Sequence, residues 1–133
     1  MTPSDEEHPN ATAYRQAAAA FRAGDIEAIE ALVDTDVVWH VPGDASIAGD
    51  LRGREALTTF LTRLAELGFW LREHDVFGND AHVCALSEMG ATRPGVDVST
   101  RVVSIFHFSN GRQVERWFYP DDMRTWNIIL GAS

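Results

Sequence analysis

The stretch VSTRVVSIFHFSNGRQVERWFY, residues 98–119, decides the fold class of this 133-residue chain. It is rich in β-branched and aromatic residues on both sides of Asn110-Gly111, which is the pattern of two strands. Asn-Gly is the strongest short signal for a two-residue hairpin loop, because both residues adopt positive φ angles more readily than others. The stretch therefore predicts two long antiparallel strands joined by a tight turn.

The sequence on either side of this hairpin supplies further strands and, before them, helices. Gly78-Asn79-Asp80 is a second turn signal, and it separates two more segments of strand composition. The N-terminal half has apolar residues at helical spacing, and Asp121-Asp122 after the last strand predicts a capped C-terminal turn. We expect helices over 11–23, 25–33 and 53–67, strands over 36–41, 69–77, 82–91, 98–109 and 113–119, and a short strand or loop over 45–52.

This order of elements predicts a single α+β domain over residues 10–133, preceded by a mobile leader over residues 1–9. The helices of the N-terminal half are expected to pack on one face of a curved, mostly antiparallel sheet. A curved sheet covered by helices encloses a concave space of the kind in which small molecules bind. The alternative is that side chains fill this space completely.

Charge and composition limit the partners of the domain. A net charge of −9 and a pI near 4.8 argue against nucleic acid and against an anionic membrane, because both bind basic surfaces. The single cysteine, Cys84, excludes an intramolecular disulfide, and its apolar neighbours indicate a buried thiol. The five histidines lack the short spacing of zinc ligands, so we expect no metal and no other cofactor. Residues 1–9 are polar and acidic, unlike a signal peptide, which predicts a cytoplasmic protein.

Three parts of the sequence resemble the SnoaL-like branch of the nuclear-transport-factor-2-like superfamily, which has the ketosteroid isomerase fold. They are FRAGD (21–25), DVVWHVPG (36–43) with GDLRGREAL (49–57), and FHF (106–108) with WFYPDD (117–122). The resemblance implies a conical barrel, in which a strongly curved mixed or antiparallel sheet wraps around three helices from the N-terminal half and encloses a pocket. It also implies a homodimer formed through the outer face of the sheet.

The catalytic residues of enzymes in this superfamily are not matched by the sequence. The ketosteroid isomerase pattern places its carboxylate base at Val41 and its oxyanion-binding Asp near Ser104. The polyketide cyclase pattern has its acid–base Asp where this chain has Phe118, and the Asp–Arg–Asp set of the epoxide hydrolases lacks the same Asp. The resemblance therefore implies a fold without implying one reaction.

His40 is the candidate acid–base residue, because an imidazole titrates near neutral pH. The epoxide hydrolase pattern has a pocket-facing polar residue at this position, two before Pro42, whereas the isomerase pattern turns Val41 into the pocket. Alternation along the strand allows only one of the two, since Val41 shares a face with Trp39 and His40 has the other face. The alternative for His40 is a position outside the pocket or a role in capping a loop.

Arg116 has the same parity along its strand as Phe118, for which the resemblance implies a position facing the pocket. A buried guanidinium needs a carboxylate or an anionic ligand as its partner. The alternative is an outward Arg116 that pairs with Glu88 or Glu115. The residues expected to line the pocket are Tyr14, Trp39, Val41, Phe60, Ser104, Phe106, Arg116 and Phe118.

We therefore expect a bacterial-type SnoaL-like protein whose pocket binds a small, apolar or weakly polar organic molecule. If the protein is an enzyme, the superfamily implies isomerisation, cyclisation, dehydration or hydrolysis without a cofactor, with His40 as the acid or base. The alternative is a non-catalytic module for ligand binding or dimerisation.

Overall fold

The first helix begins close to the start of the described part of the chain. The structure is a computed structural model that describes residues 7–132, so residues 1–6 of the expected leader lie outside the described residues. Of the remaining leader residues, Glu7 and His8 precede helix α1 (Pro9–Arg22), and Pro9 is its first residue. His8 caps this helix, because its Nδ1 accepts the backbone N–H of Asn10 at 3.1 Å. Pro9 fits the first turn, where a backbone donor has no partner within the helix.

The second helix is shorter than the sequence predicts. Helix α2 spans Ile26–Glu30, and Asp25 caps it by accepting the backbone N–H of Ala28 at 3.1 Å. Val33, expected to be the last residue of this helix, instead begins strand β1 (Val33–Val41). The expectation for Val33 is wrong because its β-branched side chain favours extended backbone, and in the strand it is completely buried.

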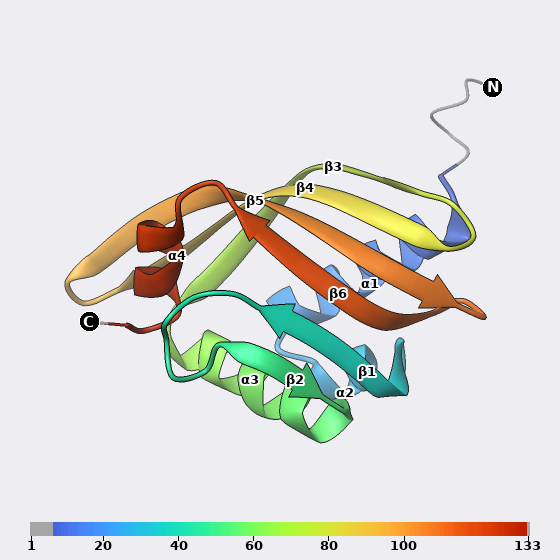
Figure 1. Cartoon of the computed structure of the whole chain (residues 1–133), viewed down its shortest axis with the longest axis horizontal. Coiled ribbons are helices and arrows are strands. Elements are labelled where there is room, and N and C mark those ends of the chain that lie inside the picture. The colour runs from blue at the N-terminus through green and yellow to red at the C-terminus, as the bar shows by residue number, and fades with distance from the viewer. Residues whose placement is uncertain (1–6, 133) are drawn as a thin grey trace.

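Six strands form one mixed sheet with the order β2-β1-β6-β5-β4-β3 (Figure 1). Strands β3 to β6 form the expected antiparallel meander, whereas β1 pairs with β6 in parallel. Asn110 and Gly111 have φ angles of 53° and 77°, the positive values that a two-residue hairpin loop needs. The remaining strands are β2 (Gly49–Arg52), β3 (Phe69–Gly78), β4 (His82–Arg93), β5 (Val96–Ser109) and β6 (Arg112–Pro120).

Two more helices complete the α+β fold. Helix α3 (Arg54–Glu66) has the expected position between β2 and β3. A fourth helix, α4 (Met123–Ile129), follows the last strand, where the sequence predicts only a capped turn. Asp122 is the cap, accepting the backbone N–H of Thr125 at 3.2 Å. Trp126 in this helix is 1% exposed, so packing against the rest of the protein stabilises a helix of only seven residues.

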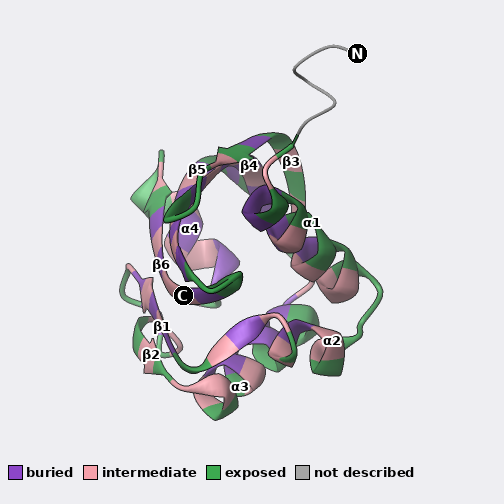
Figure 2. Ribbon diagram, turned by 90° about the vertical axis from the view of Figure 1, so that its right-hand side faces the viewer, coloured by how far each residue is buried: buried purple, intermediate pink, exposed green. Residues whose placement is uncertain are grey.

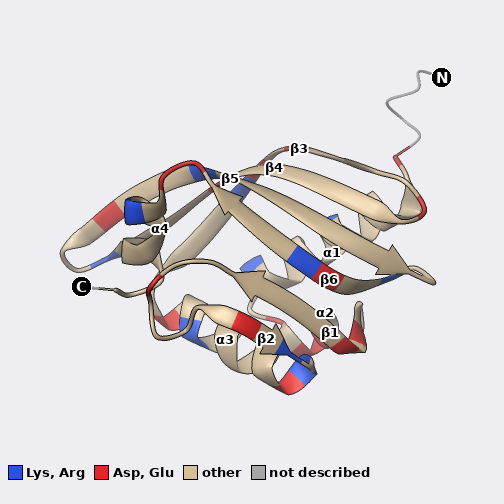
Figure 3. Ribbon diagram, in the orientation of Figure 1, with Lys and Arg blue, Asp and Glu red and all other residues tan. Residues whose placement is uncertain are grey.

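The helices and the sheet surround a common interior. Figure 2 shows strands β3 to β6 along one side, helices α1, α2 and α3 along the other, and α4 within this arrangement. Basic and acidic residues are interspersed over the helices and strands (Figure 3). No described helix is long and apolar enough to cross a bilayer. Because the sheet and the helices enclose this interior, we expect a binding site to lie there.

Candidate functional site

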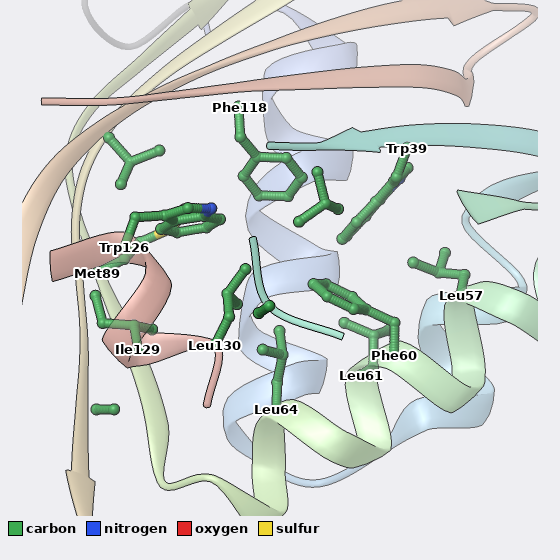
Figure 4. Close-up of a cluster of buried hydrophobic side chains, with 14 of the residues drawn as sticks. Trp39, Leu57, Phe60, Leu61, Leu64, Met89, Phe118, Trp126, Ile129 and Leu130 are labelled. Atoms are coloured by element: carbon green, nitrogen blue, oxygen red, sulfur yellow. The ribbon is translucent and has the colours of Figure 1, made fainter. Parts of the chain in front are cut away.

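A small cavity lies in this interior, between the helices and the inner face of the sheet. Its volume is about 50 Å³, which admits only a few water molecules. In Figure 4, Trp39, Phe60, Phe118 and Trp126 point toward one another from β1, α3, β6 and α4. All four line the cavity, and so does Tyr14 from α1. The rest of the wall is mostly aliphatic, so the cavity is lined chiefly by apolar side chains.

Arg116 is the charged side chain of the cavity wall. It is only 7% exposed, although it carries a guanidinium. The central carbon of this group lies 4.0 Å from the ring centroid of Phe118 and 4.5 Å from those of Trp39 and Phe106. Three rings at these distances stabilise the cation by cation–π attraction, which partly offsets the cost of burial. Arg116 therefore belongs to an aromatic cage rather than to a salt bridge.

The alternation of residues along β6 explains this position. Arg116 and Phe118 are buried on the inner face. Glu115, which precedes Arg116, and Trp117, which lies between the two, are partly exposed on the other face. The burial of Arg116 places it on the inner face of the sheet. Among the described residues, Glu88 pairs with Arg72 and Glu115 with His40, so Arg116 does not form the outward pair of the alternative.

The hydrogen bonds of Arg116 leave much of its donor capacity unused. Its Nη2 donates to the hydroxyl of Ser104 at 2.9 Å, the one hydrogen bond it makes within residues 7–132. Its Nε is buried and has no partner among the described residues. A guanidinium has five N–H donors, so the buried cation has donors to offer to a further acceptor.

The ionisable groups around the cavity keep their ordinary charge at neutral pH. Burial lowers the pKa of Arg116 to about 10, and the nearby Tyr14 and Glu73 oppose this shift. Burial also raises the pKa of Tyr14 to about 12, so its phenol stays protonated. Tyr14 donates to the carboxylate of Glu73 at 3.2 Å, and Arg22 pairs with the same carboxylate. Glu73 is thus occupied by two other groups and does not bond to Arg116.

His40 does not lie in the cavity. It is on the other face of β1 from Trp39, with Nδ1 2.9 Å from a carboxylate oxygen of Asp50 and Nε2 2.6 Å from one of Glu115. Its ring stacks on Trp117 with a centroid distance of 5.5 Å. This placement corrects the expectation that His40 faces the pocket: the apolar residues of β1 take the buried face, and the imidazole lies on the outer face.

The two carboxylates give His40 a pH-dependent role in stability. Hydrogen bonds first to Glu115 and then to Asp50 raise its pKa above the ordinary value of 6.5. Because the folded-state pKa is raised, the stabilisation is complete below about pH 6.5 and is lost as the pH rises through the folded-state pKa. We expect His40→Asn to destabilise the protein by about 1 kcal/mol or less at pH 5.5, and by less at pH 8.5.

Urea unfolding of both proteins across this pH range measures the difference. His74→Asn is the matched control, because His74 is exposed and makes no ion pair among the described residues. A difference between wild type and His40→Asn that stays constant with pH would contradict this role for the imidazole.

The other predicted site residues separate into two groups. Tyr14, Trp39, Phe60, Arg116 and Phe118 line the cavity. The three that do not line it are nevertheless buried around it: Val41 in the apolar core, Ser104 as the acceptor for Arg116, and Phe106 in the aromatic cage.

Several residues of the wall escape the sequence analysis. Trp126 comes from the unexpected helix α4, Met89 from β4 and Gln113 from the start of β6. The Nε1–H of Trp39 donates to Oε1 of Gln113 at 2.6 Å, which holds the indole against the cavity. The alternation of residues along β4 indicates an inward position for Met89. No local sequence pattern indicates one for Trp126.

The described residues provide no evident metal site. Within residues 7–132, no group of three or more His, Cys, Asp or Glu side chains is placed to hold a metal ion. The polar groups of the cavity are a guanidinium, a phenol and an amide, none of which is a preferred ligand of zinc or magnesium. Chemically, the arrangement is suited to hold an organic molecule and to donate hydrogen bonds to it.

Comparisons with known proteins agree with this architecture. Bal32a, from a soil-derived mobile gene cassette, is 29% identical, with a TM-score of 0.86 over 92% of this chain and 96% of that chain. TerC, co-crystallized with polyporic acid, is 20% identical, with a TM-score of 0.81 over 94% and 100%. An LEH-like epoxide hydrolase from M. tuberculosis is 21% identical, with a TM-score of 0.75 over 90% of each chain.

The sequence itself places the chain in a family. No curated protein matches it. The family model of the SnoaL-like domain, however, matches residues 14–116, which include most of α1, helices α2 and α3, strands β1 to β5 and the first part of β6. The chain therefore belongs to the SnoaL-like family, with the nuclear-transport-factor-2-like fold.

Proposed function

We propose that this protein binds a small, mostly apolar organic molecule in the conical space between its sheet and its helices. The observation that carries the proposal is Arg116, a buried cation in the cavity wall with unused donors and no carboxylate partner among the described residues. Burying a charge without a partner is costly, and a binding function gives a reason for that cost. The aromatic wall around it suits an apolar ligand.

Binding without chemistry is the function that the geometry supports best. Among the described residues, no carboxylate or imidazole lines the cavity, and the ionisable groups that do, Arg116 and Tyr14, are both protonated at neutral pH. They are placed to hold a ligand and not to remove a proton from it. TerC, which shares this fold, was co-crystallized with an organic molecule, polyporic acid. The likeness to an epoxide hydrolase keeps cofactor-independent catalysis as the second candidate.

A ligand must displace side chains to enter. The free cavity holds about 50 Å³, whereas pockets for organic ligands are several times larger. Met89 is the adaptable part of the wall, because its thioether chain changes rotamer at little cost. Phe60 lines both the cavity and an open surface groove between α3 and residues 46–52. Movement of this ring would join the groove to the cavity, so we take the groove as the entrance.

Ligand-observed NMR with one- and two-ring aromatic compounds tests the proposal. We expect binding to the wild type that becomes about tenfold weaker or more in Phe118→Trp, because a larger ring fills the cavity. Phe77→Trp is the matched control, since Phe77 is 52% exposed and lies outside the cavity. Affinity that is equal in Phe118→Trp and in the control would contradict binding in this cavity.

We also propose that two copies of the chain associate through the outer face of the sheet. Tyr119 on β6 is 53% exposed there, and the neighbouring Val103, Ile105 and Trp117 are only partly covered. An apolar sheet face of this kind is typical of an interface. Sedimentation of the 14.7 kDa chain measures the mass directly, and a single-chain mass would contradict the dimer.

A further inference from the structure

The cation of the cavity has no counter-charge in the described chain. The ion pairs within residues 7–132 do not include Arg116. Glu73, whose charge acts on Arg116, already pairs with Arg22 and accepts from Tyr14. Ser104 is neutral and satisfies one donor only. Arg116 is therefore a buried cation without a direct ion-pair partner among the described residues, in a chain whose net charge is −9.

The surroundings of the guanidinium restrict how a partner approaches it. The ring centroids of Phe118, Trp39 and Phe106 lie 4.0 to 4.5 Å from its central carbon. The N–H donors of a guanidinium lie in its plane, and Nε has no partner among the described residues, so an acceptor would meet the group in that plane. A carboxylate fits an edge of this kind, because its two oxygens lie in one plane with the spacing of two guanidinium N–H groups.

The rest of the wall determines which kind of molecule can carry this carboxylate. Beyond Arg116, the cavity is bounded by apolar side chains, among them Phe60, Leu64, Met89 and Trp126. These side chains cannot pair with a second charged group on the ligand. The carbonyl oxygen of Gln113 is already used by the indole of Trp39. A flat hydrocarbon body in contact with aromatic rings satisfies these walls, because stacked and edge-on rings attract one another.

We infer that the ligand is an aromatic monocarboxylic acid, with its carboxylate on the edge of Arg116 and its rings against the apolar wall. The inference rests on the proposed function and names the class of ligand for the same site. Two features carry it: a buried guanidinium that makes no ion pair and has an unpartnered Nε, and the aromatic rings that surround it in the cavity wall. The negative net charge of the protein repels anions at long range, so recognition depends on the local pair.

Acid and amide pairs of the same shape test the inference. The probes are benzoate with benzamide and 2-naphthoate with 2-naphthamide, titrated by calorimetry into the wild type, Arg116→Met, Arg116→Lys and Arg101→Met. We expect the wild type to bind an acid about 30-fold or more tightly than its amide, because only the acid supplies the missing charge. Arg116→Met is expected to lose this preference, and Arg116→Lys, without the planar fork, to retain part of it.

Arg101→Met is the matched control for the lost charge. Arg101 is exposed on the outer face and pairs with Asp121, so its replacement should leave both affinities unchanged. If Arg116→Met still binds the amides, the variant is folded. If it does not fold, the preference for acid over amide is compared between Arg116→Lys and Arg101→Met instead. Equal affinity of acid and amide for the wild type would overturn the acid class and leave the proposed function standing. Failure of all four compounds to bind would overturn both.

Discussion

Arg116→Met is expected to raise the free energy of unfolding of the ligand-free protein by about 1–2 kcal/mol, the lower part of the range for replacing buried charges by apolar groups. Folding removes the guanidinium from water and gives it one neutral hydrogen-bond partner in return. Cation–π contacts with three rings recover part of this cost. A methionine of similar length keeps contact with these rings through its sulfur and loses no hydration.

Urea unfolding measures this effect as a rise in the midpoint at an unchanged slope. The control is again Arg101→Met, for which we expect a change within about 0.5 kcal/mol because its side chain is exposed. A variant at Arg116 that is less stable than the control would show that the guanidinium serves the fold, and the reason for assigning it to a ligand would be lost.

Trp126→Ala is expected to lower the free energy of unfolding by about 3–5 kcal/mol, the usual cost of removing a buried indole. Trp126 is 1% exposed, and its ring lies 5.5 Å from that of Phe118. Its Nε1–H donates to the carbonyl of Pro42 at 2.9 Å, which ties α4 to the end of β1. The substitution therefore removes packing from the cavity wall and leaves that partly buried carbonyl without its donor.

Trp117→Ala is the matched control, since Trp117 is adjacent in strand β6 to the cavity residues but lies on the outer face, stacked on His40. We expect a loss of about 1–2 kcal/mol there, because the ring is only partly buried. Thermal or urea unfolding of the two variants measures both losses. Equal losses would contradict the placement of Trp126 in the core, with α4 packed against the sheet.

The parts of the fold that follow from the sequence are those set by local chemistry. Asn110-Gly111 fixes the hairpin because both positions need positive φ angles. Asp25 and Asp122 mark the first turns of helices because their side chains accept backbone N–H groups there. The length of α4 could not be predicted in the same way, since only the burial of Trp126 against distant segments stabilises it.

The site shows the same division. Alternation places Arg116 with Phe118, and both face the interior. Alternation also separates His40 from Trp39, but it does not say which of them faces the interior. The alternate residues of β1 that include Trp39 are the more apolar, which favours them for the buried face, and they are the buried ones in the structure. The partners of Glu73 are 59 and 51 residues away in the sequence, at Tyr14 and Arg22, so no local pattern could reveal that carboxylate as part of the interior.

A crystal structure of the protein with 2-naphthoate tests the central claim most directly, because it locates the ligand and its charge together. The account predicts the naphthalene rings between Phe60 and Trp126, with Met89 displaced, and carboxylate oxygens about 2.7–2.9 Å from the guanidinium nitrogens of Arg116. A ligand bound only on the outer face of the sheet, with the cavity unchanged and Arg116 still bonded to Ser104 alone, would contradict it.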